Sequence, residues 1–132
     1  MRRRRGVAAI VVAVLVGVGL FVHFALPDTH ASDVAADALY AAAVYAALVV
    51  LVPRWPRMVV AAIAAGWCVA VELFQLTGIP EQWGVVFTPA MLVFGTVFEP
   101  RDLVVYIVTI AVAVLADVLV SRRRPPRVEA AR

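Results

Sequence analysis

Four long apolar stretches, separated by short polar breaks, make up most of this chain. They cover about residues 6–26, 34–52, 58–76 and 102–120. An α-helix rises about 1.5 Å per residue, so roughly 20 apolar residues cross the hydrocarbon core of a membrane. The pattern therefore predicts an all-α integral membrane bundle of four transmembrane helices, with Ser32 or Asp33 as the N-cap of the second helix.

The first stretch has the outline of a secretory signal, with arginines at residues 2–5 followed by an apolar run. The run from Gly6 to Pro27 is uncharged and is longer than the roughly 7–15 apolar residues of a signal. We therefore expect a true first spanning helix.

A shorter apolar segment, residues 84–98, is interrupted by Pro89 and Gly95. As a helix of about 15 residues it would reach roughly 22 Å, which is short for a span. With four spans, the N-terminal arginines, the turn at Arg54 and Arg57, and the C-terminal arginines all lie on one side, as the positive-inside rule requires. We therefore expect a short outer re-entrant or interfacial helix over residues 86–98, although a fifth span stays an alternative.

The amino-acid composition also indicates that most of the chain is surrounded by lipid and not by water. Hydrophobic residues make up 64% of the chain and charged residues 16%, a balance that excludes a soluble domain and a disordered chain. The net charge of +3 comes from arginines in two terminal groups, residues 1–5 and 121–132. We interpret the first as a cytoplasmic arginine cluster and the second as a cytoplasmic disordered tail; both set topology, and no nucleic-acid partner is expected.

The basic residues are all arginine in a background rich in alanine and valine, which is typical of bacteria with GC-rich genomes. The expected location is thus the bacterial inner membrane, with both termini in the cytoplasm.

Small and polar side chains repeat at steps of three and four along three of the predicted helices. Such spacing places them on one helix face, where small residues allow close packing. The faces are Asp33, Asp37 and Tyr40 followed by Ala38, Ala42 and Ala46; Ala61, Ala65, Cys68, Glu72 and Gln75; and Asp102, Tyr106, Thr109, Ala113 and Ala116. Bulky residues of the third stretch, such as Trp67, are expected to face lipid.

In the four-span topology the polar ends of these faces converge on the outer side of the membrane. The converging residues are Asp37, Tyr40, Glu72, Gln75, Arg101, Asp102 and Tyr106. They form either an interhelical hydrogen-bond network or an outward-facing pocket for a cation or a lipid headgroup. Neither a nucleophile motif nor a metal-ligand spacing accompanies them, so no catalytic residue, metal or cofactor is expected.

Two polar residues are expected outside this set. Asp117 is predicted to pair with the neighbouring arginines at residues 122–124, and His30 to lie in a solvated loop.

Several motifs resemble those of a family of small bacterial membrane proteins of unknown function, numbered 2809. They are Asp37-x-x-Tyr40, Glu72-x-x-Gln75, Gly95-x-x-Phe98, Asp102-x-x-x-Tyr106 and the later Asp117, and the resemblance covers about residues 7–120. It implies that Asp37, Glu72, Gln75, Asp102 and Tyr106 act together, and it implies no known reaction.

The Glu72-x-x-Gln75 motif is also similar to one in VanZ-like proteins, which are associated with low-level resistance to teicoplanin-type glycopeptides. Tyr106 stands where those proteins have asparagine.

The leading functional hypothesis is a non-enzymatic multi-pass protein, VanZ-like in broad role, that binds the headgroup of an envelope lipid or amphiphile. Glu72 and Asp102 would be its charged anchors, and membrane lipids its partners. The alternative is an accessory structural subunit of a larger membrane complex, or a homo-oligomer. An ion-coupled transporter is disfavoured, because apart from Asp117 the inner halves of the helices offer no polar route.

Overall fold

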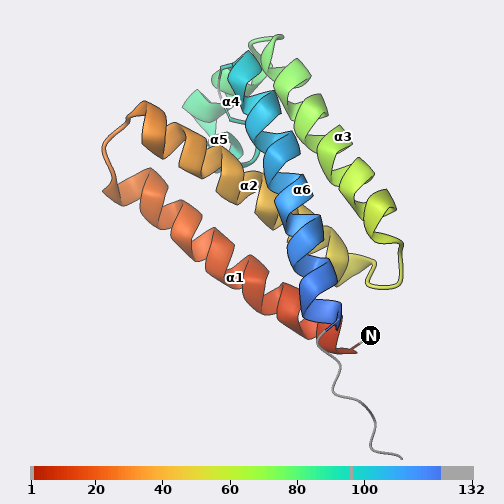
Figure 1. Cartoon of the computed structure of the whole chain (residues 1–132). Coiled ribbons are helices and arrows are strands. Elements are labelled where there is room, and N and C mark those ends of the chain that lie inside the picture. Colours follow the sequence, from red (N-terminus) through yellow and green to blue (C-terminus); the bar gives the residue numbers. More distant parts are fainter. Residues whose placement is uncertain (1, 96, 123–132) are drawn as a thin grey trace, which may run out of the picture.

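The computed structural model describes residues 2–95 and 97–122, and in these ranges the regular structure is entirely helical (Figure 1). The helices are α1 (Arg2–Ala25), α2 (His30–Leu51), α3 (Arg57–Gln75), α4 (Ile79–Val86), α5 (Pro89–Phe94) and α6 (Pro100–Arg122). Of these, α1, α2, α3 and α6 are each long and apolar enough to cross a membrane. The prediction of an all-α membrane bundle with four spans is confirmed.

The long helices extend beyond the expected spans at several ends. The arginines at residues 2–5 belong to α1, and α6 continues through Ser121 and Arg122. The rest of the expected tail, residues 123–132, lies outside the described residues.

Helix α2 begins four residues before the expected start at Val34 because Thr29 caps it. The Thr29 hydroxyl accepts a hydrogen bond from the Ser32 backbone nitrogen (3.2 Å), and the Ser32 hydroxyl accepts one from the Thr29 nitrogen (2.8 Å). This reciprocal capping box satisfies two backbone donors that a helix end leaves free. His30 is therefore in the first turn of α2 and not in a loop.

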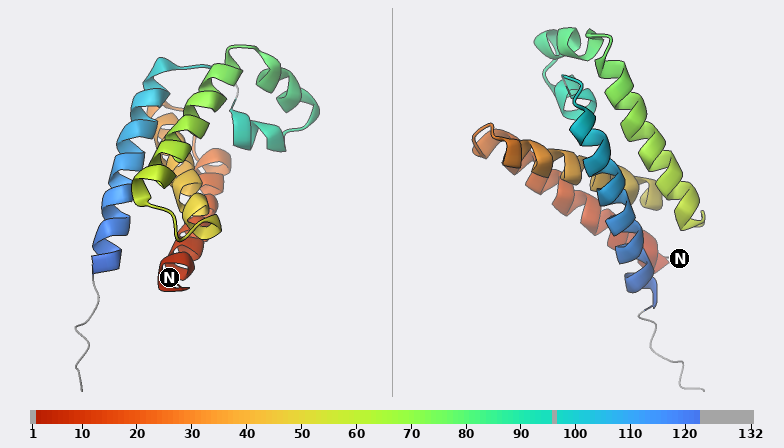
Figure 2. Two further views of the ribbon diagram at one scale, coloured as in Figure 1. Left: turned by 90° about the vertical axis from the view of Figure 1, so that its right-hand side faces the viewer. Right: turned by 45° about the horizontal axis from the view of Figure 1, so that its top comes forward.

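Two short helices, α4 and α5, replace the single helix expected over residues 86–98. Phe87, between them, is extended (φ −140°, ψ 87°), and Pro89 opens α5, because proline cannot continue a preceding helix but fits a first turn. Gly95 ends α5 with a φ of 62°. At about 1.5 Å per residue, neither helix is long enough to span a membrane. In Figure 2 they fold back beside the end of α3.

Helix α2 is the centre of the bundle and packs against α1, α3 and α6, while α6 also packs against α3. Figure 1 shows α1 and α2 side by side, crossing the pair formed by α3 and α6. The core is built largely from small side chains, among them Ala41, Ala64 and Cys68, each of which has no exposed surface. Small residues let helices approach closely where lipid supplies no hydrophobic driving force.

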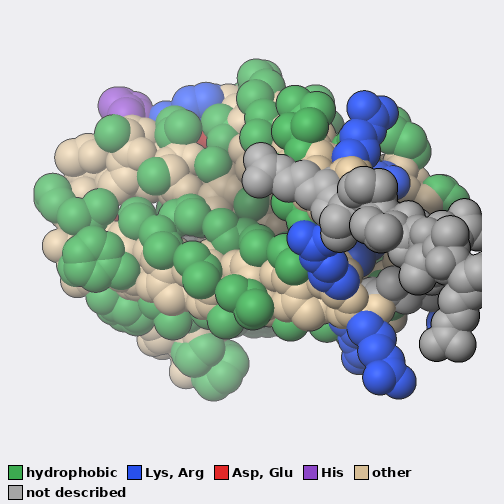
Figure 3. Space-filling view, turned by 60° about the horizontal axis from the view of Figure 1, so that its bottom comes forward, with side chains coloured by type: hydrophobic (Ala, Val, Ile, Leu, Met, Phe, Trp, Pro, Cys, Tyr) green, Lys and Arg blue, Asp and Glu red, His purple; other side chains and the backbone are tan. Residues whose placement is uncertain are grey.

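Most large apolar side chains face outward. Ile10, Phe21 and Leu115 are each more than half exposed, and hydrophobic side chains cover much of the surface in Figure 3. A soluble protein would bury such residues, so this arrangement fits a lipid environment.

The predicted packing face of α3 is present, with Ala61, Cys68, Glu72 and Gln75 buried. The face of α6 differs at its end. Ala116, expected to be on the face, is exposed, whereas Asp117 is largely buried, because its partners lie on neighbouring helices.

Candidate functional site

The predicted polar residues meet at one end of the bundle, next to α4 and α5. We call this the acidic end. Its members come from α2 (Asp37 and Tyr40), α3 (Glu72 and Gln75) and α6 (Arg101, Asp102 and Tyr106). The structure thus places side chains from three helices in one cluster, as the helix faces indicated.

Tyr106 links the three helices. Its hydroxyl donates a hydrogen bond to Glu72 Oε1 at 2.9 Å and lies 3.4 Å from Asp37 Oδ1. The Glu72 side chain is fully buried, with 0% of its surface exposed, and its Oε2 accepts a longer bond from the Glu99 backbone nitrogen (3.4 Å). A carboxyl group at this depth in an apolar bundle therefore has donors from α6 and from the segment that precedes it.

Arg101 pairs with carboxylates near the surface and not with Glu72. Its guanidinium lies 3.0 Å from Glu99 Oε2 and 3.3 Å from Asp102 Oδ1, and its Nη1 is 2.9 Å from His30 Nδ1. These contacts tie the start of α6 to the start of α2.

Carboxylates outnumber cations at the acidic end. Asp37 is close enough to Asp102, Glu72 and Arg101 to interact electrostatically with all three. With Glu99 included, four carboxyl groups in the described residues stand against one guanidinium, which pairs with Glu99 and Asp102. Among the described residues, no group of three His, Cys, Asp or Glu side chains is placed to hold a metal ion. The excess of acceptor oxygens suits a ligand that donates hydrogen bonds or carries positive charge.

Tyr40 connects α2 to α5 and to α3. Its hydroxyl donates to the Val93 carbonyl (2.7 Å) and accepts from Trp67 Nε1 (2.8 Å). The expectation that Trp67 faces lipid alone is incomplete: 44% of its surface is exposed, yet its ring nitrogen is hydrogen-bonded. A tryptophan N–H usually finds a partner when its ring leaves water, so a tryptophan on a predicted span is itself a signal of a hydrogen bond.

Gln75 holds α5 from the other side. Its Nε2 donates to the Phe94 carbonyl (2.8 Å), while its buried Oε1 has no hydrogen-bond partner in the described part of the chain. Gly95 comes directly after Phe94, and a Cβ at this position would collide with the Gln75 side-chain nitrogen.

An aromatic cluster completes the attachment of α4 and α5. The rings of Phe74, Trp83 and Phe94 pack edge to face, with centroids 5.5 to 5.9 Å apart. Helices α4 and α5 are thus fixed against the polar cluster by two side-chain hydrogen bonds and three rings.

A second polar cluster lies at the opposite end of the bundle, which we call the arginine end. Asp117 pairs there with Arg4 (2.7 Å) and Arg57 (3.3 Å) and accepts a hydrogen bond from the Tyr45 hydroxyl (3.1 Å). Arg4 also donates to the Pro53 carbonyl at 2.8 Å. In the described part of the chain, the charged partners of Asp117 come from α1 and α3, and Ser121 of α6 lies 3.4 Å from its Oδ1. Of the neighbouring arginines expected as partners, Arg123 and Arg124 lie outside the described residues.

Four membrane-capable helices with polar side chains buried between them define a small multi-pass membrane protein. Residues 26–110 match the family described as "Protein of unknown function (DUF2809)", and the chain belongs to this family, as its motifs indicated. The matched range contains every predicted site residue but neither Arg4 nor Asp117. No curated protein and no solved structure matches the chain. The more distant likeness to VanZ-like proteins stays a prediction.

Proposed function

We propose that the protein binds the headgroup of an envelope lipid or amphiphile at the acidic end, without catalysis, in a role broadly like that of VanZ. In this proposal it is a bacterial inner-membrane protein with both termini in the cytoplasm and the acidic end outward. The observation that carries the proposal is the fully buried Glu72 beside Asp37 and Asp102, near which Arg101 is the one cation among the residues that the structure describes. Ionisable groups at such depth are costly and usually serve a function.

The available chemistry favours a headgroup with amine or hydroxyl donors. The carboxylates are acceptors, and Gln75 adds a buried Oε1 that has no partner among residues 2–95 and 97–122. Tyr40 and Tyr106 would orient the headgroup, and Glu72 and Asp102 would anchor it. A purely anionic headgroup would be repelled by the same set.

Helices α4 and α5 provide the entrance in this proposal. Tyr40 and Gln75 donate these bonds to main-chain carbonyls of α5, so the hydroxyl oxygens of an incoming headgroup can accept both bonds in place of the carbonyls, whose own new donors would come from water or from the headgroup. The exposed Val85 and Val86 at the end of α4, together with the exposed Phe87 after it, would keep the segment in contact with lipid.

Native mass spectrometry of the protein extracted from its own membrane tests the proposal. We expect the wild-type chain to retain an amine- or hydroxyl-bearing lipid. The amount of lipid retained by the double variant Glu72→Gln, Asp102→Asn should be at least tenfold lower, because each charge-assisted hydrogen bond contributes about 1.5–3 kcal/mol. The matched control is Asp33→Asn, which removes an exposed carboxylate on α2.

Two results would count against the proposal. Equal lipid retention by the double variant would show that the carboxylates do not bind it. A double variant that no longer folds, combined with a folded single Asp102→Asn variant that keeps its lipid, would favour a purely structural hydrogen-bond network.

The alternative, an accessory subunit of a larger complex, is favoured by α1. Only Ala8 and Val22 of this helix are buried, which leaves most of its apolar surface open to lipid or to another protein. A stoichiometric partner protein in the same mass spectra would support this alternative, and a monomer with bound lipid would oppose it.

A further inference from the structure

The arginine end carries an excess of positive charge, whereas the acidic end carries an excess of acidic residues. In the described part of the chain, this end carries the arginines at residues 2–5, Arg54, Arg57 and Arg122, against the single carboxylate of Asp117. Figure 3 shows arginine side chains grouped at one end of a largely hydrophobic surface. The charge balance of the two ends is therefore opposite.

The buried part of this charge is not neutral. Arg4 and Arg57 share Asp117, so the three side chains together carry one net positive charge. The exposed fractions of the side chains are 16% for Arg4, 11% for Asp117 and 35% for Arg57, so Arg57 is the member of the cluster that reaches the surface. Because one carboxylate does not balance two guanidinium groups that are partly removed from solvent, a second anion beside Arg57 would be favourable.

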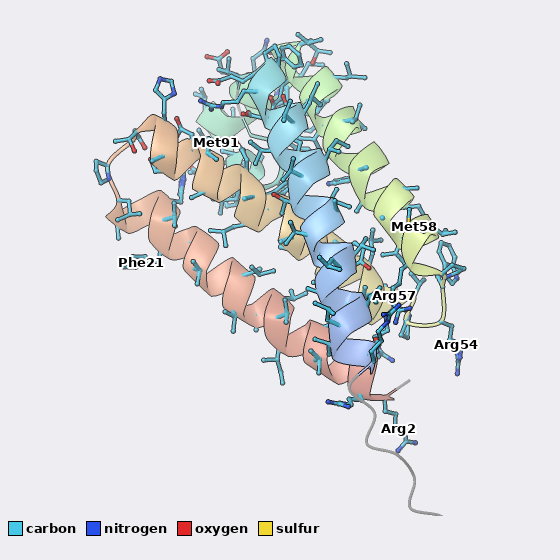
Figure 4. The ribbon with its side chains drawn as sticks, in the orientation of Figure 1. Arg2, Phe21, Arg54, Arg57, Met58 and Met91 are labelled. Carbon is cyan, nitrogen blue, oxygen red and sulfur yellow. The ribbon has the colours of Figure 1, made fainter. Side chains whose placement is uncertain are left out.

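A cavity for such an anion adjoins the cluster. It is open to the surface, has a volume of about 450 Å³ and is lined by Arg57, Val118, Ser121 and Arg122. Figure 4 shows Arg57 beside the end of α6, whereas Arg54 and Arg2 point away from the bundle. Arg57 comes from α3, and Ser121 and Arg122 come from α6. Their guanidinium and hydroxyl groups are donors that suit a phosphate, although the Ser121 hydroxyl also lies 3.4 Å from Asp117 Oδ1.

We propose that this cavity binds the phosphate of an anionic phospholipid, with Arg57 and Arg122 as its two charged ligands and Ser121 as a neutral donor. The site is separate from the proposed outer headgroup site, and neither proposal depends on the other.

A lipid fits the surroundings better than free phosphate does. Leu115, Leu119 and Arg122 follow one another at steps of four and three, so they lie on one face of α6. Leu115 and Leu119 are 58% and 52% exposed. A headgroup at Arg122 would thus have its acyl chains along these leucines, toward the middle of the bilayer.

Titration of the purified full-length protein with phosphatidylglycerol, followed by native mass spectrometry, tests the assignment. Arg122→Gln should weaken binding about five-fold, since a basic residue near a lipid surface contributes roughly 1 kcal/mol. Arg57→Gln should weaken it at least as much, while Arg54→Gln, an exposed arginine outside the cavity, should change it less than two-fold. Phosphatidylcholine, which has no net charge, should bind several-fold more weakly than phosphatidylglycerol.

Because Arg57 also pairs with Asp117, its variant can fail to fold, and the Arg122 variant then decides the question. Equal losses in Arg54→Gln and Arg122→Gln would overturn the site, since they would indicate general attraction to a charged surface. Displacement of the lipid by inorganic phosphate at an equal concentration would overturn the lipid assignment in favour of free phosphate.

Discussion

Glu72 is buried among three helices, and its hydrogen-bond donors, Tyr106 and Glu99, are distant from it in the sequence. The Tyr106 hydroxyl is its short hydrogen-bond donor (2.9 Å), and Asp37 lies on the other side of that hydroxyl. The Tyr106 hydroxyl is therefore within hydrogen-bond distance of two carboxyl groups from different helices.

Replacing Tyr106 with phenylalanine should lower the free energy of unfolding by about 1–2 kcal/mol, because the ring still fills its space while Glu72 loses its short donor. Unfolding by increasing denaturing detergent in mixed micelles measures this. Thr109→Val, which removes a half-buried hydroxyl one turn away on the same helix, is the control and should change little. An unchanged Tyr106→Phe variant would mean that Glu72 finds another donor.

Residue faces could be predicted from the sequence, but individual partners could not. Spacing along a helix fixes which side chains share a face, and it brought Asp37, Glu72 and Tyr106 together. The partners of Arg101 depend on how far α6 is rotated and where α2 starts, neither of which spacing reveals. Asp117 and Arg4 are 113 positions apart, and no local pattern links them.

At the scale of elements, Gly95 marks the place where α5 ends and the chain turns toward α6. Its φ of 62° and ψ of −160° fall in a region that is open essentially to glycine alone. The collision of a Cβ with Gln75 adds a second constraint at the same position.

Gly95→Ala should destabilise the fold by about 1–3 kcal/mol through backbone strain and should release α5 from Gln75. Hydrogen–deuterium exchange should increase over residues 89–94, with the spanning helices unaffected. Gly66→Ala is the matched control, because nothing lies within 4 Å of a Cβ added there; it should stabilise α3 by roughly 0.5–1 kcal/mol. Unchanged exchange in the Gly95 variant would contradict the attachment of α5 through Gln75.

Long helices were predictable as elements and short ones were not. Hydropathy over about 20 residues identifies a span, because the membrane core fixes the length. The division into α4 and α5 depends on the extended backbone at Phe87, and the early start of α2 depends on a capping box of two hydroxyls. These are local hydrogen-bond details that hydropathy does not contain.

For the whole molecule, the proposed orientation is tested by single cysteines in a Cys68→Ala background. Thr88→Cys, between α4 and α5, should react with a membrane-impermeant maleimide on intact cells, and Arg54→Cys, in the α2–α3 turn, should not. Both positions are exposed, so both should react after lysis. Labelling of Arg54→Cys alone on intact cells would reverse the orientation and place the acidic end in the cytoplasm.

Helix α6 is made after α2 and α3, yet it packs against both and carries Asp102, Tyr106 and Asp117. As the chain leaves the ribosome, Glu72 enters the bilayer before its hydrogen-bond donor Tyr106 has been synthesised. The interval is longer for Arg4, whose ion-pair partner Asp117 is 113 residues further along the chain. The insertion machinery must therefore accept the early spans while their polar side chains still lack partners. Both polar clusters are complete only once α6 is made, so a chain that terminates before α6 would present its buried carboxyls to the proteases that remove unassembled membrane proteins.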